Sequence, residues 1–340
     1  MLSGVLARPF ARRAVAGYDL EMSPIRILAA ATAMESSAAI ALLALAGLGG
    51  WRNGWLDVIN SFAPMILAMA LLAAGLGYWT LEGVTRAVTL GLAMVGVIYG
   101  LALIGPEILM ASVPRSEGGQ PFRVLSANVW HDNPTPDLAV ASIMARNPDA
   151  VLLQESDGSL QPALKALKSV YPYTSDCPGA GVQIFSKSPI LAGGCGPTPG
   201  PRLDLVWIQT AAADGRPVTL VTTHFVWPFP PALQKAQSAR LAQQIHQLPT
   251  DDMILGGDFN TTPWSFAMRS QDGLLSPLKR QTRAWVSWPA RLDALRQPWS
   301  APFLPIDHLY TGPGWRLTRL TRLRIAGSDH FATEAAFTRR

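Results

Sequence analysis

A short apolar run ends at two glycines in the stretch Ile254-Leu-Gly-Gly-Asp-Phe-Asn-Thr-Thr-Pro263. The pattern predicts a buried strand that delivers Asp258 and Asn260 onto a loop, on the same side because side chains alternate along extended chain. A carboxylate beside a carboxamide suits phosphate chemistry. The alternative is an ordinary turn in which both side chains bind their own backbone. The rest of the chain decides between the two interpretations.

Further apolar runs of strand length follow one another from residue 122 to the end of the chain. We expect strands over 122–128, 150–154, 182–185, 205–210, 218–223, 253–255, 306–310, 317–325 and 331–337. Helices are expected over 137–146, 160–169 and 232–248. Many strands with few helices between them predict two sheets packed face to face with helices outside, an α/β sandwich.

Polar residues capable of chemistry lie at the ends of these expected strands. They are Asn128, Glu155, His224, Asp258, Asn260, Asp307, Asp329 and His330. Each alone has a plain structural explanation, as a solvated strand end, a buried histidine or a turn residue. Together they predict one site, because the strand ends at one edge of a sheet layer are where a converging site is built.

Several of these residues lie in short segments with a recognisable order. The order is Asn128, Leu153-Gln-Glu155, Thr223-His224, Gly257-Asp-Phe-Asn260, Ile306-Asp307 and Ser328-Asp-His330. The set resembles the endonuclease/exonuclease/phosphatase superfamily, which includes deoxyribonuclease I, inositol-polyphosphate 5-phosphatases and neutral sphingomyelinases. The resemblance covers about residues 121–340 and implies a deoxyribonuclease I-like fold. With the apolar runs before it, the chain resembles three-span glycopeptide-resistance membrane phosphoesterases.

The resemblance implies a Mg²⁺-dependent phosphoric ester hydrolase, with Mn²⁺ or Ca²⁺ as alternative ions. Hydrolysis of a phosphate ester needs a cation for the phosphoryl oxygens, a base for the attacking water and help for the leaving oxygen. The implied metal ligands are Glu155 and Asn128, with Asp329 as a further ligand. The implied base is His330, which Asp307 would orient.

The remaining members of the set have less sharply divided roles. Asp258 and Asn260 are expected to orient the attacking water or to bind phosphate and assist departure. His224 is expected to donate to a non-bridging oxygen, so that it and Asn260 also contact the substrate. Two other histidines are expected outside the site. We expect His308 to face the opposite side of its strand from Asp307, and His131 to lie on the surface in preference to contacting the phosphate.

Three apolar runs before residue 111 are long enough to span a bilayer as helices, at about 27–48, 59–79 and 87–110. Five basic residues flank these spans on one side and three on the other. This bias predicts a multi-pass protein of the cytoplasmic (inner) membrane with its N-terminus inside. The catalytic domain, 121–340, would then be periplasmic and follow a membrane domain, 1–110, and a linker, 111–120. A cleaved signal peptide is the competing interpretation of the first run.

Glu35 and the two cysteines bear on this arrangement. Glu35 lies inside the first expected span, where a carboxylate is costly, so we expect it to face a partner helix or a cavity. It would serve there either as a functional group or as a hydrogen bond holding the bundle. Cys177 and Cys195 bracket an expected strand and its turn, and an oxidising compartment would let them form a disulfide. The alternative is two separate buried thiols.

The substrate class follows from charge and aromatic residues. The net charge of +5 arises in residues 111–340, with 22 Lys/Arg against 17 Asp/Glu, and suits an anionic partner. A basic stretch is either part of that surface or a solvated sheet edge; it holds Arg316, Arg319, Arg322 and Arg324. Aromatic residues in loops suit a membrane interface; they are Trp227, Phe229, Trp264, Trp285, Trp288 and Trp299.

We therefore expect the substrate to be a lipid-linked phosphate or pyrophosphate, or a phospholipid headgroup, presented at the bilayer. The first alternative is an extracytoplasmic nuclease acting on DNA or RNA. The second is an inactive membrane receptor or scaffold, which the intact set of residues disfavours because a binding module needs no base with its orienting partner. No protein partner is expected.

Overall fold

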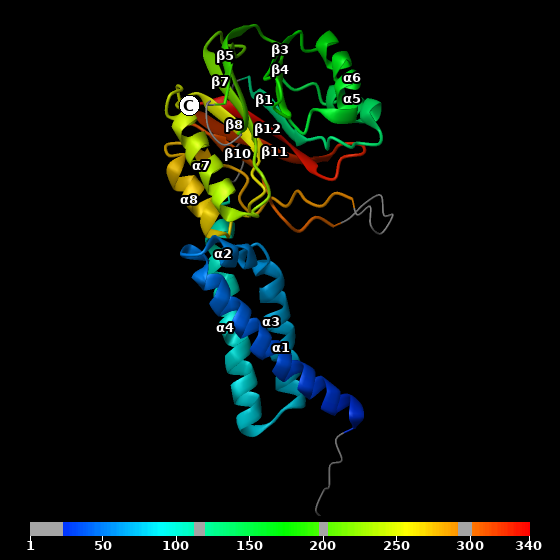
Figure 1. Cartoon of the computed structure of the whole chain (residues 1–340), viewed down its shortest axis with the longest axis vertical. Helices are drawn as coiled ribbons and strands as arrows, with labels where there is room; N and C mark the ends of the chain where they lie inside the picture. Colours follow the sequence, from blue (N-terminus) through cyan, green and yellow to red (C-terminus); the bar gives the residue numbers. More distant parts are fainter. Residues whose placement is uncertain (1–22, 112–119, 197–202, 292–300) are drawn as a thin grey trace, which may run out of the picture.

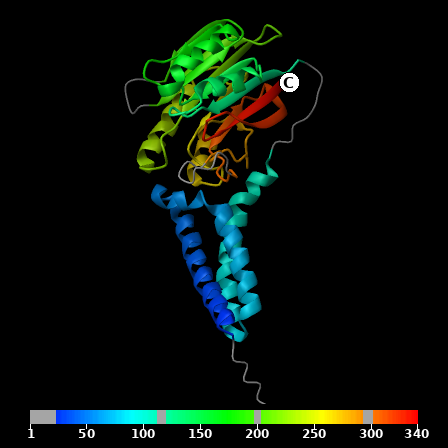
Figure 2. The same cartoon turned by 90° about the vertical axis from the view of Figure 1, so that its right-hand side faces the viewer.

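The computed structural model describes residues 23–111, 120–196, 203–291 and 301–340. An elongated bundle of helices forms the N-terminal part, and an α/β domain lies at one end of it (Figure 1). A second view shows the same stacking from the side (Figure 2). The basic leader before the first span and most of the expected linker, with Gly118 and Gly119, lie outside the described residues.

Three helices of the bundle are long and apolar enough to cross a membrane. They are α1 (Pro24–Leu48), continued by the 3-10 turn η1 (Gly49–Trp51), then α3 (Ala63–Thr80) and α4 (Gly83–Leu109). A short helix, α2 (Gly54–Asn60), joins α1 to α3 at the end that faces the α/β domain (Figure 1). Small side chains such as Ala33, Ala44 and Ala70 are buried between the helices, which lets the backbones approach closely.

Glu35 does not face a partner helix, so the expectation for it was wrong. The buried face of α1 runs through Ala33, Ser37 and Ile40, which lie three or four residues apart. Glu35 lies off this face, and its side chain is exposed on the outside of the bundle. Ser37 takes the inward position that the sequence analysis gave to the carboxylate.

The α/β domain contains two six-stranded sheets. The first has the order β11-β12-β1-β2-β4-β3 and the second β5-β6-β7-β8-β10-β9. The strands of the first sheet are β1 (Phe122–Asn128), β2 (Ala150–Gln154), β3 (Tyr173–Asp176), β4 (Val182–Ser186), β11 (Trp315–Arg324) and β12 (Phe331–Arg339). The strands of the second are β5 (Ile190–Cys195), β6 (Asp204–Ala211), β7 (Pro217–His224), β8 (Met253–Asp258), β9 (Lys279–Arg280) and β10 (Asp307–Thr311).

Apolar side chains of both sheets form the central core. Val124 and Leu152 of the first sheet pack in one cluster with Leu220 and Ile254 of the second. Helices α5 (Pro136–Met144) and α6 (Gln161–Leu164) cover the outer face of the first sheet, and α7 (Pro231–Ile245) and α8 (Phe266–Leu274) cover that of the second (Figure 1). The predicted α/β sandwich is confirmed.

The two glycines of β8 are explained by close approach. A Cβ on Gly256 would come within 2.9 Å of Leu152 and Leu309, because this position faces the other sheet. A Cβ on Gly257 would collide with the backbone carbonyl of Thr223 in the neighbouring strand. Both positions therefore exclude larger residues, and β8 reaches its end in tight contact with β7 and with the core.

Cys177 and Cys195 form a disulfide. Cys177 follows β3 of the first sheet and Cys195 ends β5 of the second, so the bond joins the two sheets near one edge of the sandwich. The arginine-rich strand β11 lies at the opposite edge of its sheet. This position agrees with the interpretation of its charges as a solvated sheet edge.

Candidate active site

Strand pairing brings the predicted residues to one edge of the sandwich. The parallel pairs β1/β2 and β7/β8 end at this edge, and His224 lies in register with Asp258. On its other side Asp258 lies in register with Asp307 of β10. Asn128 pairs with Gln154, directly before Glu155. All eight residues named from the sequence are linked there by contacts of 4.0 Å or less; they are Asn128, Glu155, His224, Asp258, Asn260, Asp307, Asp329 and His330.

His330 is held by a buried carboxylate on one ring nitrogen and faces two more on the other. Its Nδ1 lies 2.8 Å from Asp307 Oδ2, and its Nε2 lies 3.7 Å from Asp258 Oδ2 and 4.0 Å from Asp329 Oδ1. The backbone N–H of His330 also donates to Ser328 Oγ. Burial lowers the pKa of His330, but the charges of Asp307 and Asp258 outweigh it and raise the pKa to about 10.

Asp258 is the most enclosed carboxylate of the site. It accepts hydrogen bonds from the backbone N–H of Asn260 at 2.8 Å and from Asn128 Nδ2 at 3.1 Å. Burial and the nearby charge of Asp307 raise the pKa of Asp258 to about 6, although His330 acts in the opposite direction. Asp258 can therefore exchange a proton at a pH near neutrality.

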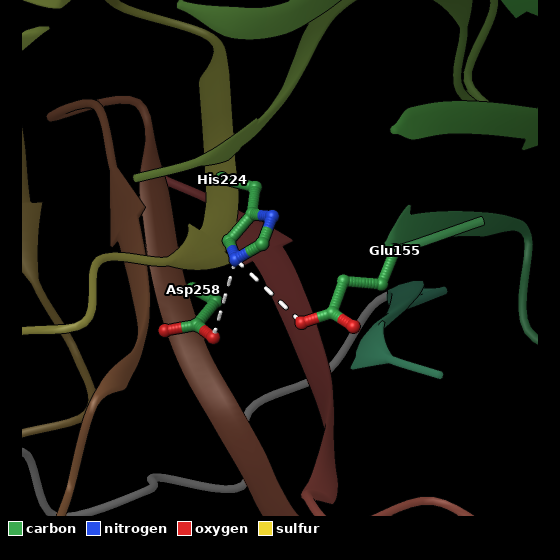
Figure 3. A group of neighbouring side chains, drawn as sticks. All are labelled: Glu155, His224 and Asp258. Atoms are coloured by element: carbon green, nitrogen blue, oxygen red, sulfur yellow. Dashed lines mark ion pairs between the residues drawn. The ribbon is translucent and has the colours of Figure 1, made fainter. Parts of the chain in front are cut away.

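Glu155 lies across the site from Asp258, with His224 between them (Figure 3). His224 Nε2 is 3.8 Å from a carboxylate oxygen of each. Glu155 accepts from Asn128 Nδ2 at 2.9 Å and contacts His131 Nδ1 at 2.7 Å. Burial alone would raise the pKa of Glu155, but the hydrogen bonds from Asn128 and His131 lower it below its usual value.

His131 is the member of the site that the sequence analysis left out. Its ring is half exposed, as expected for a surface residue, but its Nδ1 contacts Glu155 and its backbone N–H donates to the same carboxylate at 3.2 Å. The hydrogen bond to Glu155 raises the pKa of His131. Its place just after the strand that carries Asn128 was the available signal.

Glu155 and Asn260 adopt a backbone conformation that non-glycine residues seldom use. Their φ angles are 51° and 48°, in the left-handed region. Such residues cost of order 1–3 kcal/mol each and persist where the surroundings hold them. Asn260 is held by its Nδ2, which donates to the Phe225 carbonyl at 2.8 Å. The strain turns both side chains into the site directly after their strands.

The other residues discussed from the sequence lie outside this set of eight, although Trp288 contacts one of its members. His308 is buried on the other side of β10, where its Nε2 is 2.9 Å from the Thr261 carbonyl, and burial lowers its pKa to about 4. Trp288 Nε1 donates to Asp329 Oδ2 at 3.2 Å. Trp264 is buried against the helix bundle and does not line an exposed rim. Trp227 is 65% exposed, and Trp299 lies outside the described residues.

The side chains fit a hard divalent ion. Glu155, His224 and Asp258 form one group whose ligand atoms lie within 4.8 Å of one another, and Asp258, Asp307 and His330 form another. Asp329 Oδ1 is buried and receives no hydrogen bond from the described residues, as expected of an oxygen that a cation or water satisfies. Asn128 turns its amide nitrogen toward the carboxylates, so its oxygen would reach an ion only if the amide turned over.

Residues 125–330 match the Endonuclease/Exonuclease/phosphatase family, and the chain belongs to this family. Its members are phosphoester hydrolases and usually depend on a metal ion. The resemblance described from the ordered segments is thereby confirmed. A comparison with curated proteins found no match.

Solved structures share the fold. TDP2 from D. rerio, complexed with a single-strand DNA product, is 19% identical with a TM-score of 0.53, over 65% of this chain and 100% of that chain. An endonuclease/exonuclease/phosphatase from Beutenbergia cavernae is 18% identical with a TM-score of 0.52, over 65% and 72%. The catalytic domain of human nocturnin is 17% identical with a TM-score of 0.51, over 65% and 95%. Identities this low show the fold alone.

Proposed function

We propose that this protein is a Mg²⁺-dependent phosphoesterase that hydrolyses a membrane-associated phosphate ester. The substrate would be a lipid-linked phosphate or pyrophosphate, or a phospholipid headgroup. The observation that carries this proposal is the packing of the loop after Asn260 on the helix bundle. Trp264 is buried there, and its Nε1 donates to the Ser61 carbonyl at 3.0 Å. The edge of the sandwich that holds the candidate active site, called the catalytic edge below, is thus attached to the end of the helices that would lie at the membrane surface.

In this proposal the carboxylates hold the ion, and the pair formed by His330 and Asp307 activates water. Glu155 and Asp329 would bind the ion, together with Asn128. When bound, a divalent ion neutralises phosphoryl oxygens. His330 would take a proton from water at Nε2, because Asp307 fixes Nδ1 and stabilises the imidazolium. His330 acts as a base only when the charge of its carboxylate neighbours is offset, since that charge raises its pKa.

The other members position the substrate and the water. Asp258 and Asn260 would orient the attacking water or bind phosphate and assist departure of the leaving oxygen. His224 would donate from Nε2 to a non-bridging oxygen and stabilise the charge that develops there in the transition state. Its position supports this role, because its Nε2 points into the site, 3.8 Å from a carboxylate oxygen of Glu155 and of Asp258.

We also propose that the helices of residues 1–110 span the cytoplasmic membrane with the N-terminus inside, and that residues 121–340 form a periplasmic catalytic domain after the linker 111–120. The disulfide between Cys177 and Cys195 supports this side, because disulfides persist in oxidising compartments. A reporter fused after Arg340 tests the orientation. Activity of a reporter that functions only in the cytoplasm would overturn it.

The activity test uses purified full-length protein in detergent. Bis(p-nitrophenyl) phosphate, a polyprenyl pyrophosphate, phospholipids, and single- and double-stranded DNA are compared, first with Mg²⁺ and then with chelator. His330→Ala is expected to lower kcat about 10²–10⁴-fold, the usual contribution of a general base. His246→Ala, a histidine at the end of α7 that contacts the Leu274 carbonyl, is the matched control. Equal rates for His330→Ala and the parent protein would sink the hydrolase proposal, and preferred cleavage of DNA would favour a nuclease.

A further inference from the structure

A cavity of about 350 Å³ lies where the helix bundle meets the α/β domain. On the bundle side it is lined by η1, the turn after it and α2, including Trp51 and Arg52. On the other side it is lined by α7, α8 and the loops before them, including Lys235. Of the candidate active-site residues only Asn260 lines it. The cavity is therefore a separate space that adjoins the catalytic edge.

Two positively charged side chains line this cavity without an ion-pair partner among the residues that the structure describes. Arg52 and Lys235 are exposed, and no ion pair joins either of them to a residue that the structure describes. Arg52 stacks over the Trp51 ring, with its guanidinium carbon 4.3 Å from the ring centroid. Asp57 also lines the cavity, but its two oxygens each accept a backbone N–H of α8 at 2.8 Å. The negative charge of Asp57 therefore interacts with the positive N-terminal end of α8.

Exposed aromatic side chains of the kind found at a membrane surface line the cavity or lie next to residues that line it. Trp51 is 63% exposed and Trp55 58% exposed, and both lie between the end of α1 and the start of α3. The Trp55 ring contacts Phe229 of the α/β domain at 5.6 Å between centroids, and Phe229 is itself half exposed. Tryptophans are enriched where membrane helices emerge into the headgroup region. Helix α2, whose residues Asp57 and Val58 line the cavity, lies at the end of the bundle that faces the α/β domain (Figure 1).

We propose that this cavity binds the phosphate headgroup of an anionic bilayer lipid, whose acyl chains leave past Trp51 and Trp55. Arginine binds phosphate oxygens through its planar fork and lysine as a point charge, so the two cations suit one phosphate. The volume lies within the range of small-molecule sites. The lipid here is a bound anchor and not the substrate, because the carboxylate cluster lies outside the cavity. This proposal rests on the proposed membrane location and not on hydrolytic activity.

The site also joins the two parts of the protein. Arg52 comes from the turn after α1 and Lys235 from α7, so one phosphate held by both would connect the bundle to the α/β domain. Close approach is already built in at this point, since a Cβ on Gly54 would come within 2.6 Å of Pro231 at the start of α7. A bound anionic lipid would therefore strengthen the attachment of the α/β domain to the helix bundle.

The test is native mass spectrometry of the full-length protein in detergent, titrated with dioleoyl phosphatidylglycerol in the presence of chelator. The protein is expected to take up one phosphatidylglycerol that the Arg52→Ala/Lys235→Ala variant binds about tenfold more weakly. The matched control is Lys165→Ala/Lys168→Ala, which removes two exposed cations of the distant segment after α6. The charge-preserving variant Arg52→Lys/Lys235→Arg is expected to bind within about threefold of the parent protein, and melting temperatures verify the folding of each variant.

Parallel titrations use dioleoyl phosphatidylcholine and inorganic phosphate. Equal uptake of phosphatidylglycerol by the parent protein and the Arg52→Ala/Lys235→Ala variant would overturn the site. Uptake of phosphatidylcholine as tight as that of phosphatidylglycerol would overturn its charge selectivity, and phosphate binding as tight as the lipid would assign it to a soluble anion. Hydrolysis of bis(p-nitrophenyl) phosphate by the same preparation with Mg²⁺ is measured separately. If no hydrolysis is detected, the proposed function is refuted, but the measured binding of phosphatidylglycerol still stands.

Discussion

Glu155 combines two properties that seldom occur together in one residue. It has a left-handed backbone, and its carboxylate is held by Asn128 and His131 at a pKa below its usual value. A residue selected for stability alone would be glycine or asparagine at this φ. The strain is therefore best explained by the need for an ionised carboxylate at this point of the site.

Glu155→Gln is expected to separate the metal requirement from folding. The substitution keeps the size of the side chain but removes its charge, so the Mg²⁺ concentration for half-maximal rate is expected to rise at least about tenfold. Stability is expected to change by only about 1 kcal/mol, the cost of one poorly satisfied hydrogen bond. A Mg²⁺ titration of bis(p-nitrophenyl) phosphate hydrolysis measures the first effect and thermal unfolding the second. Glu82→Gln, at an exposed surface ion pair, is the control; an unchanged Mg²⁺ dependence for Glu155→Gln would refute the ligand role.

At the scale of single residues, the sequence predicts which residues belong to the site better than it predicts the local geometry that brings them into contact. Asp307 and His330 were predicted as a pair because the resemblance to the superfamily implies a base with an orienting carboxylate at these positions, and the two side chains lie 2.8 Å apart. The place of His131 after β1 was a signal that it lies near the site, but its contact with Glu155 depends on how the loop after β1 turns, which the local sequence does not fix. The exposure of Glu35 was missed since hydrophobicity alone does not fix which side of a spanning helix faces its neighbours.

The disulfide is the covalent tie between the two sheets at the edge formed by β3 and β5. Cys177→Ser/Cys195→Ser is expected to lower stability by about 3 kcal/mol, because the bond closes a loop of 18 residues and restricts the unfolded chain. Melting temperatures of parent and variant, each with and without dithiothreitol, measure the effect. Reductant is expected to destabilise the parent and leave the variant unchanged. A parent protein insensitive to reductant would contradict the prediction.

Glu334 of β12 ties together three elements of the first sheet and its helix layer. It accepts hydrogen bonds from Arg123 of β1 and, at 2.8 Å, from Arg146 after α5. Burial raises its pKa, but the hydrogen bonds from both arginines outweigh burial and lower it. A carboxyl group with a lowered folded pKa stabilises the protein above its unfolded pKa of about 4.3, and this contribution is lost as pH falls through the folded value.

Glu334→Gln is therefore expected to destabilise the protein by roughly 1–2 kcal/mol at pH 7, where the parent carboxylate is ionised. The arginines are partly solvated, which limits the effect. The difference in melting temperature between parent and variant is expected to shrink as the pH is lowered below about 4. Melting curves at pH 7, 5 and 3.5 provide the measurement. A difference that stays constant over this range would show that the contribution of Glu334 does not depend on its charge.

Among the elements, the long apolar strands of the core were predicted, whereas helix α8 and the strands β3, β5 and β9 were not. The central strands β2, β7 and β8 are apolar runs buried on both faces, and each was expected within a few residues. The edge strand β5 was missed because its two glycines and exposed side chains give no alternation. The expected span over 59–79 includes a turn at Ser61 and Phe62, where apolar residues continue although the helix does not.

At the scale of the whole molecule, the α/β domain is fixed to the helix bundle by polar contacts that are buried or nearly so. Arg280 is buried and lies 3.1 Å from Glu107 at the end of α4. Arg269 donates to the Leu103 carbonyl of α4 at 2.8 Å. Asp57 of α2 accepts the first backbone N–H groups of α8, a few residues beyond Asn260. Composition divides the chain into two parts, but these contacts are tertiary and could not be predicted from it.

Asp57→Ala is expected to weaken the contact between α2 of the bundle and α8 of the α/β domain, next to the catalytic edge. Loss of the cap costs about 0.5–2 kcal/mol of stability. Reorientation of the edge should affect a substrate fixed in a bilayer more than one that diffuses freely. We therefore expect the ratio of kcat/KM for a lipid phosphate in vesicles to that for bis(p-nitrophenyl) phosphate to fall about tenfold, a change of about 1.4 kcal/mol.

Ser265→Ala is the matched control for Asp57→Ala. Ser265 Oγ accepts the Met268 N–H and so caps the same helix, but from within the α/β domain. Its loss should cost α8 a similar amount of stability while leaving the contact with α2 in place, so the ratio of the two kcat/KM values should stay near that of the parent. If both variants lower the two activities in parallel, α8 matters only for folding, and the orientation of the catalytic edge toward the bilayer does not select the substrate.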